Sequence, residues 1–515
     1  MSHSQPARPR ASLYGRRHAV VTGHHLASRA AAARLEQGGS AVDAMIAASA
    51  VLTVTVPHAT SLGGCAMLLE YDAAEGRLRA LNGSGRAPAA ARPDLFPRGL
   101  DPRGPRAWVV PGLVRLWAQA HRSRGRLPWP SLFTDAIDLA EHGTGFGSEV
   151  ARNLARASAD VRAQPGFAQA FSADGRDRAA GSLHTQPALA WTLKHIAQGG
   201  EDAFYRGEVA WRLAAYARQV GALLSAEDLA ASSAEWTEPV MQDYGRWQVG
   251  VMPPNSVGVL MLAQLERLKP VYDLPRDERL HAQILHAKDC LPRLRDRVAD
   301  PQAAWPWQDA AAAVSPAKSA ADSVDPRRGD PGDTAGIVLA DAEGNGLVML
   351  QSVFQPFGSG CVDPGTGILM NNRLGEFSLK PGAHNLLAPG KRPVHTLNPY
   401  IVLADGRPVL YAVSPGGVSQ TTTGVQCIFN ALLDGMRLPQ AVDAPRWSLS
   451  RDGEVMCEPG FPDEVVARLR EAGLAVATDS LHPFYFGSIK AVRRLPGGVL
   501  EAAADLRREA NALAW

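Results

Sequence analysis

Hydrophobic residues near the beginning of the chain follow helical patterns. The alanine-rich run LASRAAAARLEQ at 26–37 favours a helix, and the glycine pair that follows it is a suitable stop. Ser40 is then a candidate N-cap for AVDAMIAASAVLTVTV at 41–56, whose almost unbroken apolar character predicts a buried helix running towards a strand. Further amphipathic patterns occur over 107–240, among them WPSLFTDAIDLAEHG at 129–143.

Strands are predicted where short apolar runs alternate with turn residues. AMLLEYD at 66–72 follows a pair of glycines and is expected to be a strand. Two β-hairpins are expected further along, the first from TAGIVLAD (334–341) and GLVMLQS (346–352), the second from PYIVLAD (399–405) and PVLYAVS (408–414).

Changes in composition divide the chain into parts. Residues 1–17 look like a flexible basic arm, and 296–333 are rich in Pro, Asp, Ala and Ser without sustained periodicity, which is typical of a mobile loop or linker. A strand-rich region then opens abruptly at Thr334, and later helices are expected to begin near Ser419 and at Pro462. The abrupt change at Thr334 is the most informative feature of the pattern.

Composition and charge narrow the class of protein. The 515 residues include 53 Lys and Arg against 51 Asp and Glu, a net charge of +2, which gives no case for nucleic acid or a membrane as partner. A 46% share of hydrophobic residues with 20% charged residues is typical of a globular protein. Five scattered cysteines without a Cys-x-x-Cys pair exclude a disulfide framework. The first apolar cluster, 19–21, is too short for a signal peptide, so a cytoplasmic location is expected.

The position of Thr334 suggests one kind of chemistry. A threonine hydroxyl is a poor nucleophile unless a base removes its proton, and one arrangement uses the residue's own α-amine after the preceding peptide bond has been cut. A free α-amine titrates close to neutrality and suits this role. A threonine that opens a strand behind a pliable loop ending in Gly-Asp fits such a cleavage, although an ordinary strand-opening threonine would look the same.

Motifs spread along almost the whole chain carry a family resemblance. They keep one order from about residue 18 to 508, and they are GGSAVDAMIAA (38–48), PHATSLGG (57–64), GSGRAP (83–88), VPGLVRLW (110–117), GRLPW (125–129), DTAGIVLADAEGN (333–345), FGSGCVDPGTGILMNNR (357–373), APGKRP (388–393) and SPGG (414–417). In these motifs the chain resembles the γ-glutamyltransferase (glutathione hydrolase) family of N-terminal-nucleophile hydrolases, as a divergent member.

The resemblance implies a fold and a maturation step. The precursor would cut itself between Asp333 and Thr334 into a large subunit, 18–333 behind the arm, and a small subunit, 334–515. Both would stay in one α+β fold, a four-layer αββα sandwich, with a dimer of such pairs left open. Thr334 would attack an amide carbonyl of a small molecule through an acyl-enzyme, with its α-amine as base and then acid, and no cofactor is implied.

Further residues take expected roles from the resemblance. The strand PVLYAVS runs into Gly416 and Gly417 and then a helix, an arrangement that presents backbone N–H groups, and the family uses this pair to hold the oxyanion. Ser352 falls where the family carries a second hydroxyl that hydrogen-bonds near the nucleophile.

The expected substrate pocket departs from the family pattern. Classical members have Thr-Thr-His at the nucleophile, whereas Ala335 and Gly336 follow Thr334 here. They also hold the substrate carboxylate with an arginine at the position of Ser84. Arg86 lies two residues later and would point to the same face of a strand, so one interpretation is that it binds the carboxylate instead. The other interpretation is that it is a surface charge, and the sequence does not decide between the two.

Other departures concern charge. Where the family carries an acidic residue that grips the substrate amine, this chain has Glu376, and Arg373 stands where Gln or Glu is commoner in the family. The paired serines beside the oxyanion site become His395 and Thr396, and Phe354 replaces an asparagine. We therefore expect an acyl group with less positive and more negative charge than glutamyl.

Alternatives remain at this point. Related enzymes with altered pockets act on cephalosporin-type amides, on oxamate, or on a carbon–carbon bond next to a carbonyl, and the resemblance does not choose among these. A metal site at His281, His286 and Cys290 is disfavoured because these residues are expected to share one helix face. A rival of another class is a non-catalytic homologue with a binding role.

Overall fold

The computed structural model describes residues 10–300, 333–450, 453–478 and 486–515. Most of the loop expected at 296–333, and the first nine residues of the expected arm, lie outside the described residues. The rest of that arm differs from the expectation, because Leu13–Gly15 forms β1 and pairs with the strand β20 (Leu500–Ala504). Part of the segment that was expected to be flexible therefore has a defined structure, because it forms backbone hydrogen bonds at the edge of a sheet.

The first large sheet is built from both ends of the sequence. Its order is β21 (Asn511–Ala514), β2 (His18–Thr22), β12 (Asp333–Asp341), β13 (Gly346–Phe354), β3 (Cys65–Asp72), β4 (Arg77–Gly83) and β9 (Glu235–Thr237). The predicted hairpin of β12 and β13 is confirmed, and it lies in the middle of this sheet. Neighbouring strands are antiparallel.

Both faces of β12 are covered, which explains its continuous apolar sequence. Ile337 and Leu339 belong to the core on the helical side, whereas Val338 and Ala340 belong to the core between the sheets. Successive side chains of a strand point to opposite faces, so a strand buried on both sides has no polar face to show.

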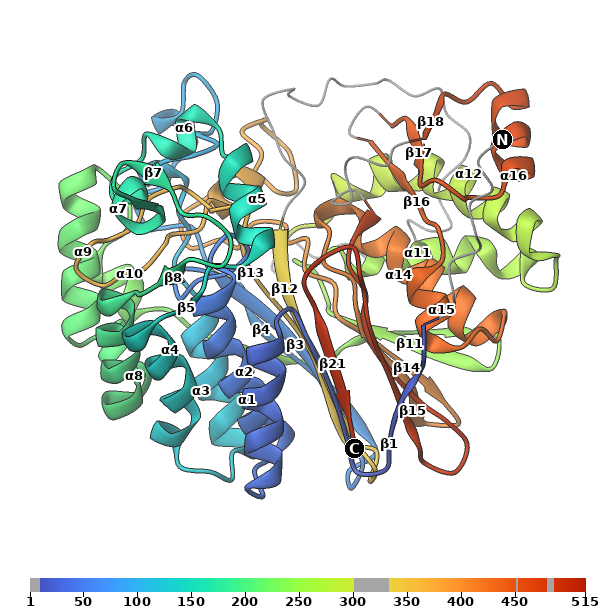
Figure 1. Cartoon of the computed structure of the whole chain (residues 1–515). Helices are drawn as coiled ribbons and strands as arrows, with labels where there is room; N and C mark the ends of the chain where they lie inside the picture. Colours follow the sequence, from blue (N-terminus) through green and yellow to red (C-terminus); the bar gives the residue numbers. More distant parts are fainter. Residues whose placement is uncertain (1–9, 301–332, 451–452, 479–485) are drawn as a thin grey trace.

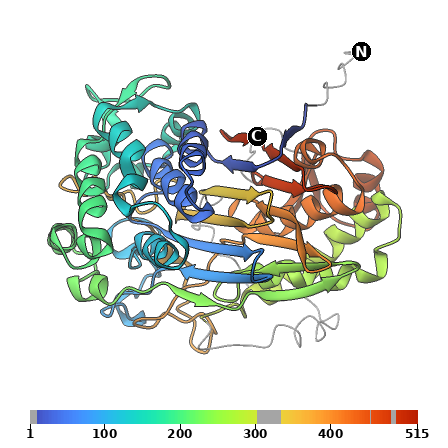
Figure 2. The same ribbon diagram turned by 90° about the horizontal axis from the view of Figure 1, so that it is seen from below.

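The second large sheet stacks on the first through that shared core. Its order is β1, β20, β19 (Lys490–Arg494), β15 (Arg407–Val413), β14 (Tyr400–Ala404), β11 (Trp247–Val251) and β10 (Val240–Tyr244). The second predicted hairpin, β14 with β15, is confirmed. The strands fill the middle of the molecule with helices on both outer sides (Figure 1, Figure 2).

The helical layer over the first sheet is centred on an almost completely buried helix. Ser40 is the N-cap of α2 (Ala41–Thr55), as the sequence predicted, and its side chain forms a capping box with Asp43; the helix extends to Thr55. The layer also contains α1 (His25–Glu36), α3 (Leu113–Arg124), α4 (Thr134–His142), α8 (Pro187–Tyr205) and α9 (Glu208–Val220).

Smaller elements complete this part of the molecule. They are β5 (Thr144–Gly145), α5 (Ser148–Arg156), α6 (Ala159–Arg162), α7 (Phe167–Phe171), β6 (Ser172–Ala173), β7 (Arg176–Asp177), β8 (Leu183–His184) and α10 (Ala226–Ala230). Of these, α5, α6 and α7 lie at its top in Figure 1.

The second helical layer covers the other sheet. It consists of α11 (Gly258–Leu268), α12 (Arg276–Arg295), α14 (Gln420–Ile428), α15 (Leu438–Asp443) and α16 (Asp463–Glu471), with a small sheet of β16 (Trp447–Leu449), β17 (Val455–Cys457) and β18 (Val476–Thr478). The four layers form the expected αββα sandwich. Among the described helices, none combines the length and apolarity needed to cross a bilayer.

Candidate active site

The predicted nucleophile lies at an irregular point of the central hairpin. In β12 and β13, Asp333 pairs with Phe354 but Ala335 pairs with Gln351, so the register shifts around Thr334. Asp333 and Thr334, which are joined by the peptide bond predicted to be cut, are 1% and 5% exposed. Phe354 has a φ of +89°, which a bulky side chain rarely adopts. A buried, distorted peptide therefore lies where cleavage was predicted.

Two hydroxyl groups meet at the carbonyl oxygen of Asp333. Thr334 Oγ1 and Ser352 Oγ each donate a hydrogen bond to that oxygen at 2.7 Å. Ser352 Oγ in turn accepts a hydrogen bond from the Phe354 N–H at 2.8 Å, which fixes its orientation. The structure thus brings the predicted second hydroxyl to the predicted cleavage site, and two donors on one carbonyl increase the electrophilicity of its carbon.

The glycine turn approaches this site from the second sheet. Gly336 has no side chain where Val413 and Pro415 pack, and a Cβ there would lie 2.6 Å from Val413 Cγ2. The turn that follows Pro415 therefore lies against β12, two residues beyond Thr334. This close packing gives a physical reason for a small residue at position 336.

The glycines themselves have distinct reasons to lack side chains. Gly416 lies so close to Gly487 that a Cβ would be 2.6 Å from the Gly487 Cα, and Gly417 has a φ of +59°. A short 3-10 turn, Gly417–Ser419, then leads into α14. Among the described residues, neither glycine amide has an acceptor in the backbone hydrogen-bond network. The pair thus resembles the predicted oxyanion site in conformation, and its role stays a prediction.

Arg373 is the most unusual charged group near the site. It is 1% exposed, and its guanidinium carbon lies 4.2 Å from the centre of the Phe354 ring. Nη1 donates to Thr396 Oγ1 at 3.2 Å, while Nε and Nη2 find no acceptor among the residues that the structure describes. Burial lowers the pKa of Arg373 to about 10, and nearby Glu376 offsets only part of that effect. A buried cation with free N–H groups can bind an anion.

The other expected pocket residues lie around Arg373. His395 is fully buried, and burial together with the charge of Arg373 holds its pKa well below the ordinary value, so its ring is neutral. Its Nδ1 accepts from the Leu397 N–H at 3.3 Å. Glu376 lies 3.3 Å from Arg295 Nη2, so the carboxylate expected to grip an amine already faces a guanidinium.

Arg86 lies in a different environment. Its guanidinium pairs with Glu235 at 3.0 Å and donates to the Gly390 carbonyl at 3.1 Å, and its side chain is 27% exposed. Ser84, the position of the family arginine, is buried and accepts a hydrogen bond from Asn255 Nδ2. Among the described residues, the contacts of Arg86 do not include the group around Arg373. The structure brings the predicted pocket residues together without Arg86.

Sequence reasoning missed a second set of charges around the side chain of Asp333. His58 Nε2 lies 3.2 Å from Asp333 Oδ2, and Arg508 pairs with Asp333 Oδ1. His58, Glu149 and Asp333 could surround a metal ion, but Arg508 also lies 3.9 Å from Glu149, so a cation is already present. His58 lies in the motif PHATSLGG, but nothing in that motif pointed to Asp333.

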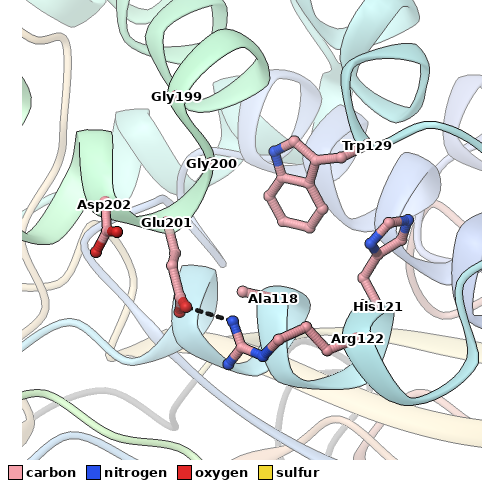
Figure 3. A pocket seen from close by; sticks show the side chains of 8 residues that line it. All are labelled: Ala118, His121, Arg122, Trp129, Gly199, Gly200, Glu201 and Asp202. Carbon is pink, nitrogen blue, oxygen red and sulfur yellow. Dashed lines mark hydrogen bonds and ion pairs between the residues drawn. The ribbon is translucent and has the colours of Figure 1, made fainter.

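A surface hollow lies between α3 and the kink of α8. It measures about 230 Å³ and is lined by His121, Arg122, Trp129 and Glu201 among others (Figure 3). Glu201 pairs with both Arg122 and Arg115, so the charges of the hollow are already matched. It contributes no candidate for the active site.

Comparison with known proteins identifies the family of the chain. The family model for gamma-glutamyltranspeptidase matches residues 27–515. The chain belongs to the gamma-glutamyltranspeptidase family. It is accordingly a hydrolase or acyltransferase of the N-terminal-nucleophile type.

The names of the relatives of this gamma-glutamyltranspeptidase homologue specify different substrates. It is 35% identical to the oxamate amidohydrolase proenzyme of Klebsiella pneumoniae, over 96% of this chain and 98% of that protein. It is 31% identical to the glutathione hydrolase-like YwrD proenzyme of Bacillus subtilis, over 98% and 99%. The crystal structure of cephalosporin acylase from Bacillus halodurans matches with a TM-score of 0.89 and 30% identity, over 100% and 98% of the two chains.

Proposed function

We propose that the chain is a self-processing hydrolase whose nucleophile is Thr334. The precursor cuts itself between Asp333 and Thr334 and yields a large subunit, 18–333 behind a short N-terminal segment, and a small subunit, 334–515. The two hydroxyls at 2.7 Å from the Asp333 carbonyl oxygen carry this proposal. The names of the relatives, which are proenzymes, support it further.

The steps follow from the groups present. Cleavage frees the α-amine of Thr334, which takes the proton of Oγ1 as this oxygen attacks the substrate carbonyl. The N–H groups of Gly416 and Gly417 stabilise the oxyanion, and the protonated amine gives its proton to the leaving group. Water then releases the acyl group from Thr334.

The acyl group that fits this pocket is small and anionic. Two buried nitrogens of Arg373, Nε and Nη2, have no described acceptor, and a carboxylate offers two oxygens in a matching geometry. Glu376, which would hold a glutamyl amine, faces Arg295 instead. We therefore propose an amide of a short dicarboxylic acid, such as oxamate, as substrate, in line with the oxamate amidohydrolase relative.

Two measurements test this function. The purified protein should run as two fragments, and sequencing of the smaller one should begin at Thr334. Thr334→Ala should stay a single chain, while Thr334→Ser keeps a hydroxyl and should still be cut. Oxamate should be hydrolysed faster than a γ-glutamyl anilide. An intact wild-type chain would refute self-processing, and brisk turnover of the anilide would refute the proposed acyl group.

A further inference from the structure

The side chain of Asp333 is held by groups from three separate parts of the chain. His58 follows α2, Glu149 is on α5 and Arg508 precedes β21, and each of these side chains is at most 6% exposed. His58 Nε2 lies 3.2 Å from Asp333 Oδ2 and 3.8 Å from Glu149 Oε1, and Arg508 pairs with Asp333 Oδ1. Both oxygens of the Asp333 carboxylate are thus engaged by cationic side chains.

The same carboxylate contacts the peptide bond to be cut. Asp333 Oδ1 accepts a hydrogen bond at 2.8 Å from the N–H of Thr334. That nitrogen is the leaving group when Thr334 Oγ1 attacks the Asp333 carbonyl carbon: a C–O bond replaces the C–N bond, and the proton of the hydroxyl passes to the nitrogen. Water then hydrolyses the resulting ester, which leaves a carboxyl group on Asp333 and the free α-amine and hydroxyl of Thr334. The scissile peptide is therefore held at both ends, at its oxygen by two hydroxyls and at its nitrogen by its own side chain.

The charges in this cluster are balanced for an ion pair. Burial lowers the pKa of His58, but the carboxylate of Asp333, helped by Glu149, outweighs this and raises it to about 9. Burial raises the pKa of Asp333, but Arg508 and His58 hold it below its ordinary range. Lys490 is buried nearby, and burial lowers its pKa to about 8. At neutral pH, Asp333 is thus an anion and His58 a cation.

The backbone around the peptide is also distorted. Phe354, the register partner of Asp333, has a φ of +89°, and the pairing of β12 with β13 shifts beside it. Such strain persists only where surrounding contacts hold it. The contacts of the Asp333 side chain are of this kind, because they are buried, ionic and come from distant segments.

We infer that the Asp333 side chain, fixed by His58 and Arg508, positions its own peptide bond for attack by the Thr334 hydroxyl. His58 and Arg508 are then positioning residues for self-cleavage, and they act through Asp333. This inference rests on the proposed self-processing. His58 and Arg508 should therefore affect self-cleavage but not substrate hydrolysis, because the matured enzyme no longer contains the peptide bond that these residues position.

The test follows cleavage of newly made chains by pulse–chase in a cell-free translation system. Asp333→Asn keeps the shape of the side chain but loses its charge, and His58→Gln removes the cation. Each should slow cleavage at least ten-fold. Once cut, each variant should turn over substrate at the wild-type rate per Thr334 N-terminus. Wild-type cleavage should slow as pH rises through about 9, where His58 loses its proton, and His58→Gln should not show this loss.

A matched control separates positioning from loss of stability. Glu501→Gln removes another fully buried carboxylate paired with an arginine, Arg493, in the second sheet. It should lower the melting temperature without slowing cleavage. Cleavage of Asp333→Asn and His58→Gln at the wild-type rate, or equal slowing in Glu501→Gln, would overturn the inference. A wild-type chain that is never cut would instead refute the proposed function, with Thr334→Ala as the uncut reference.

Discussion

Replacing Arg373 by Met should make the enzyme more stable and less active. The guanidinium is fully buried, and among the described residues only Thr396 accepts a hydrogen bond from it. Methionine is similar in length, is apolar, and can still pack on the Phe354 ring. The substitution therefore removes a buried charge while leaving the volume of the site almost unchanged.

The pKa of Arg373 gives the size of the gain in stability. Burial lowers it from its ordinary value to about 10, which corresponds to a cost of about 3 kcal/mol for the charged form in the folded protein. Because the pKa of Arg373 is lower in the folded state than in the unfolded chain, the charged guanidinium destabilises the fold by this full amount at neutral pH. The destabilisation declines as pH rises above about 10. Because Met also loses the hydrogen bond to Thr396, we expect a net gain of about 1–3 kcal/mol.

The loss of activity should be larger. Two charge-assisted hydrogen bonds from Arg373 to a substrate carboxylate contribute about 1.5–3 kcal/mol each, so kcat/KM should fall by about 10² to 10⁴. The assay compares oxamate with its neutral analogue oxamide. The preference of the wild type for oxamate should vanish in Arg373→Met, while the rate with oxamide should change little.

Arg79→Met is a suitable control for this prediction. Arg79 also lies over an aromatic ring, that of Trp236 at 4.7 Å, but it pairs with Glu70 at 3.0 Å. Removing it should destabilise the fold slightly and leave turnover unchanged. If Arg373→Met instead lowers the free energy of unfolding and keeps its preference for oxamate, Arg373 is a structural residue and the proposed anion site is wrong.

Three further predictions concern the cleavage site and the turn. Ser352→Ala removes one of two hydrogen bonds to the scissile carbonyl and should slow cleavage about ten-fold in pulse–chase, whereas wild-type kinetics would exclude its role. Gly416→Ala places a Cβ 2.6 Å from the Gly487 Cα and should lower kcat by about 10²–10³ in the cut enzyme; full activity would argue against an oxyanion site there. In uncut Thr334→Ala, protonated His58 stabilises the fold fully below its ordinary pKa of 6.5. That contribution, about 3 kcal/mol, should be lost as pH rises through about 9, as measured by urea unfolding, and a flat profile would contradict the ion pair.

The hairpins and buried helices could be predicted from sequence because local patterns determine them. The runs of β12 and β13 flank a short turn, and Ser40 with Asp43 has the spacing of a capping box. The strand at Leu13–Gly15 was missed because it is short, largely exposed and held by pairing to β20, which lies at the far end of the chain.

The charges of the site depend on contacts that sequence does not contain. Arg373 was predicted as a pocket residue, but it is its burial against Phe354 that leaves Nε and Nη2 without an acceptor among the described residues. Arg86 was left open, and its pairing with Glu235 depends on how β4 meets β9. His58 and Asp333 are separated by most of the large-subunit sequence, so no local pattern could join them.

The strand order of the first sheet has a consequence for refolding. From one edge, β21 belongs to the C-terminal part of the chain, β2 to the N-terminal part, β12 and β13 again to the C-terminal part, and β3 to the N-terminal part. Neither part can complete this sheet alone. In the uncut chain folding is a first-order process, but once the peptide bond before Thr334 is broken, renaturation requires two chains to meet. The yield of refolded enzyme should then depend on protein concentration. Unfolding of the cut enzyme should also be harder to reverse than unfolding of the precursor.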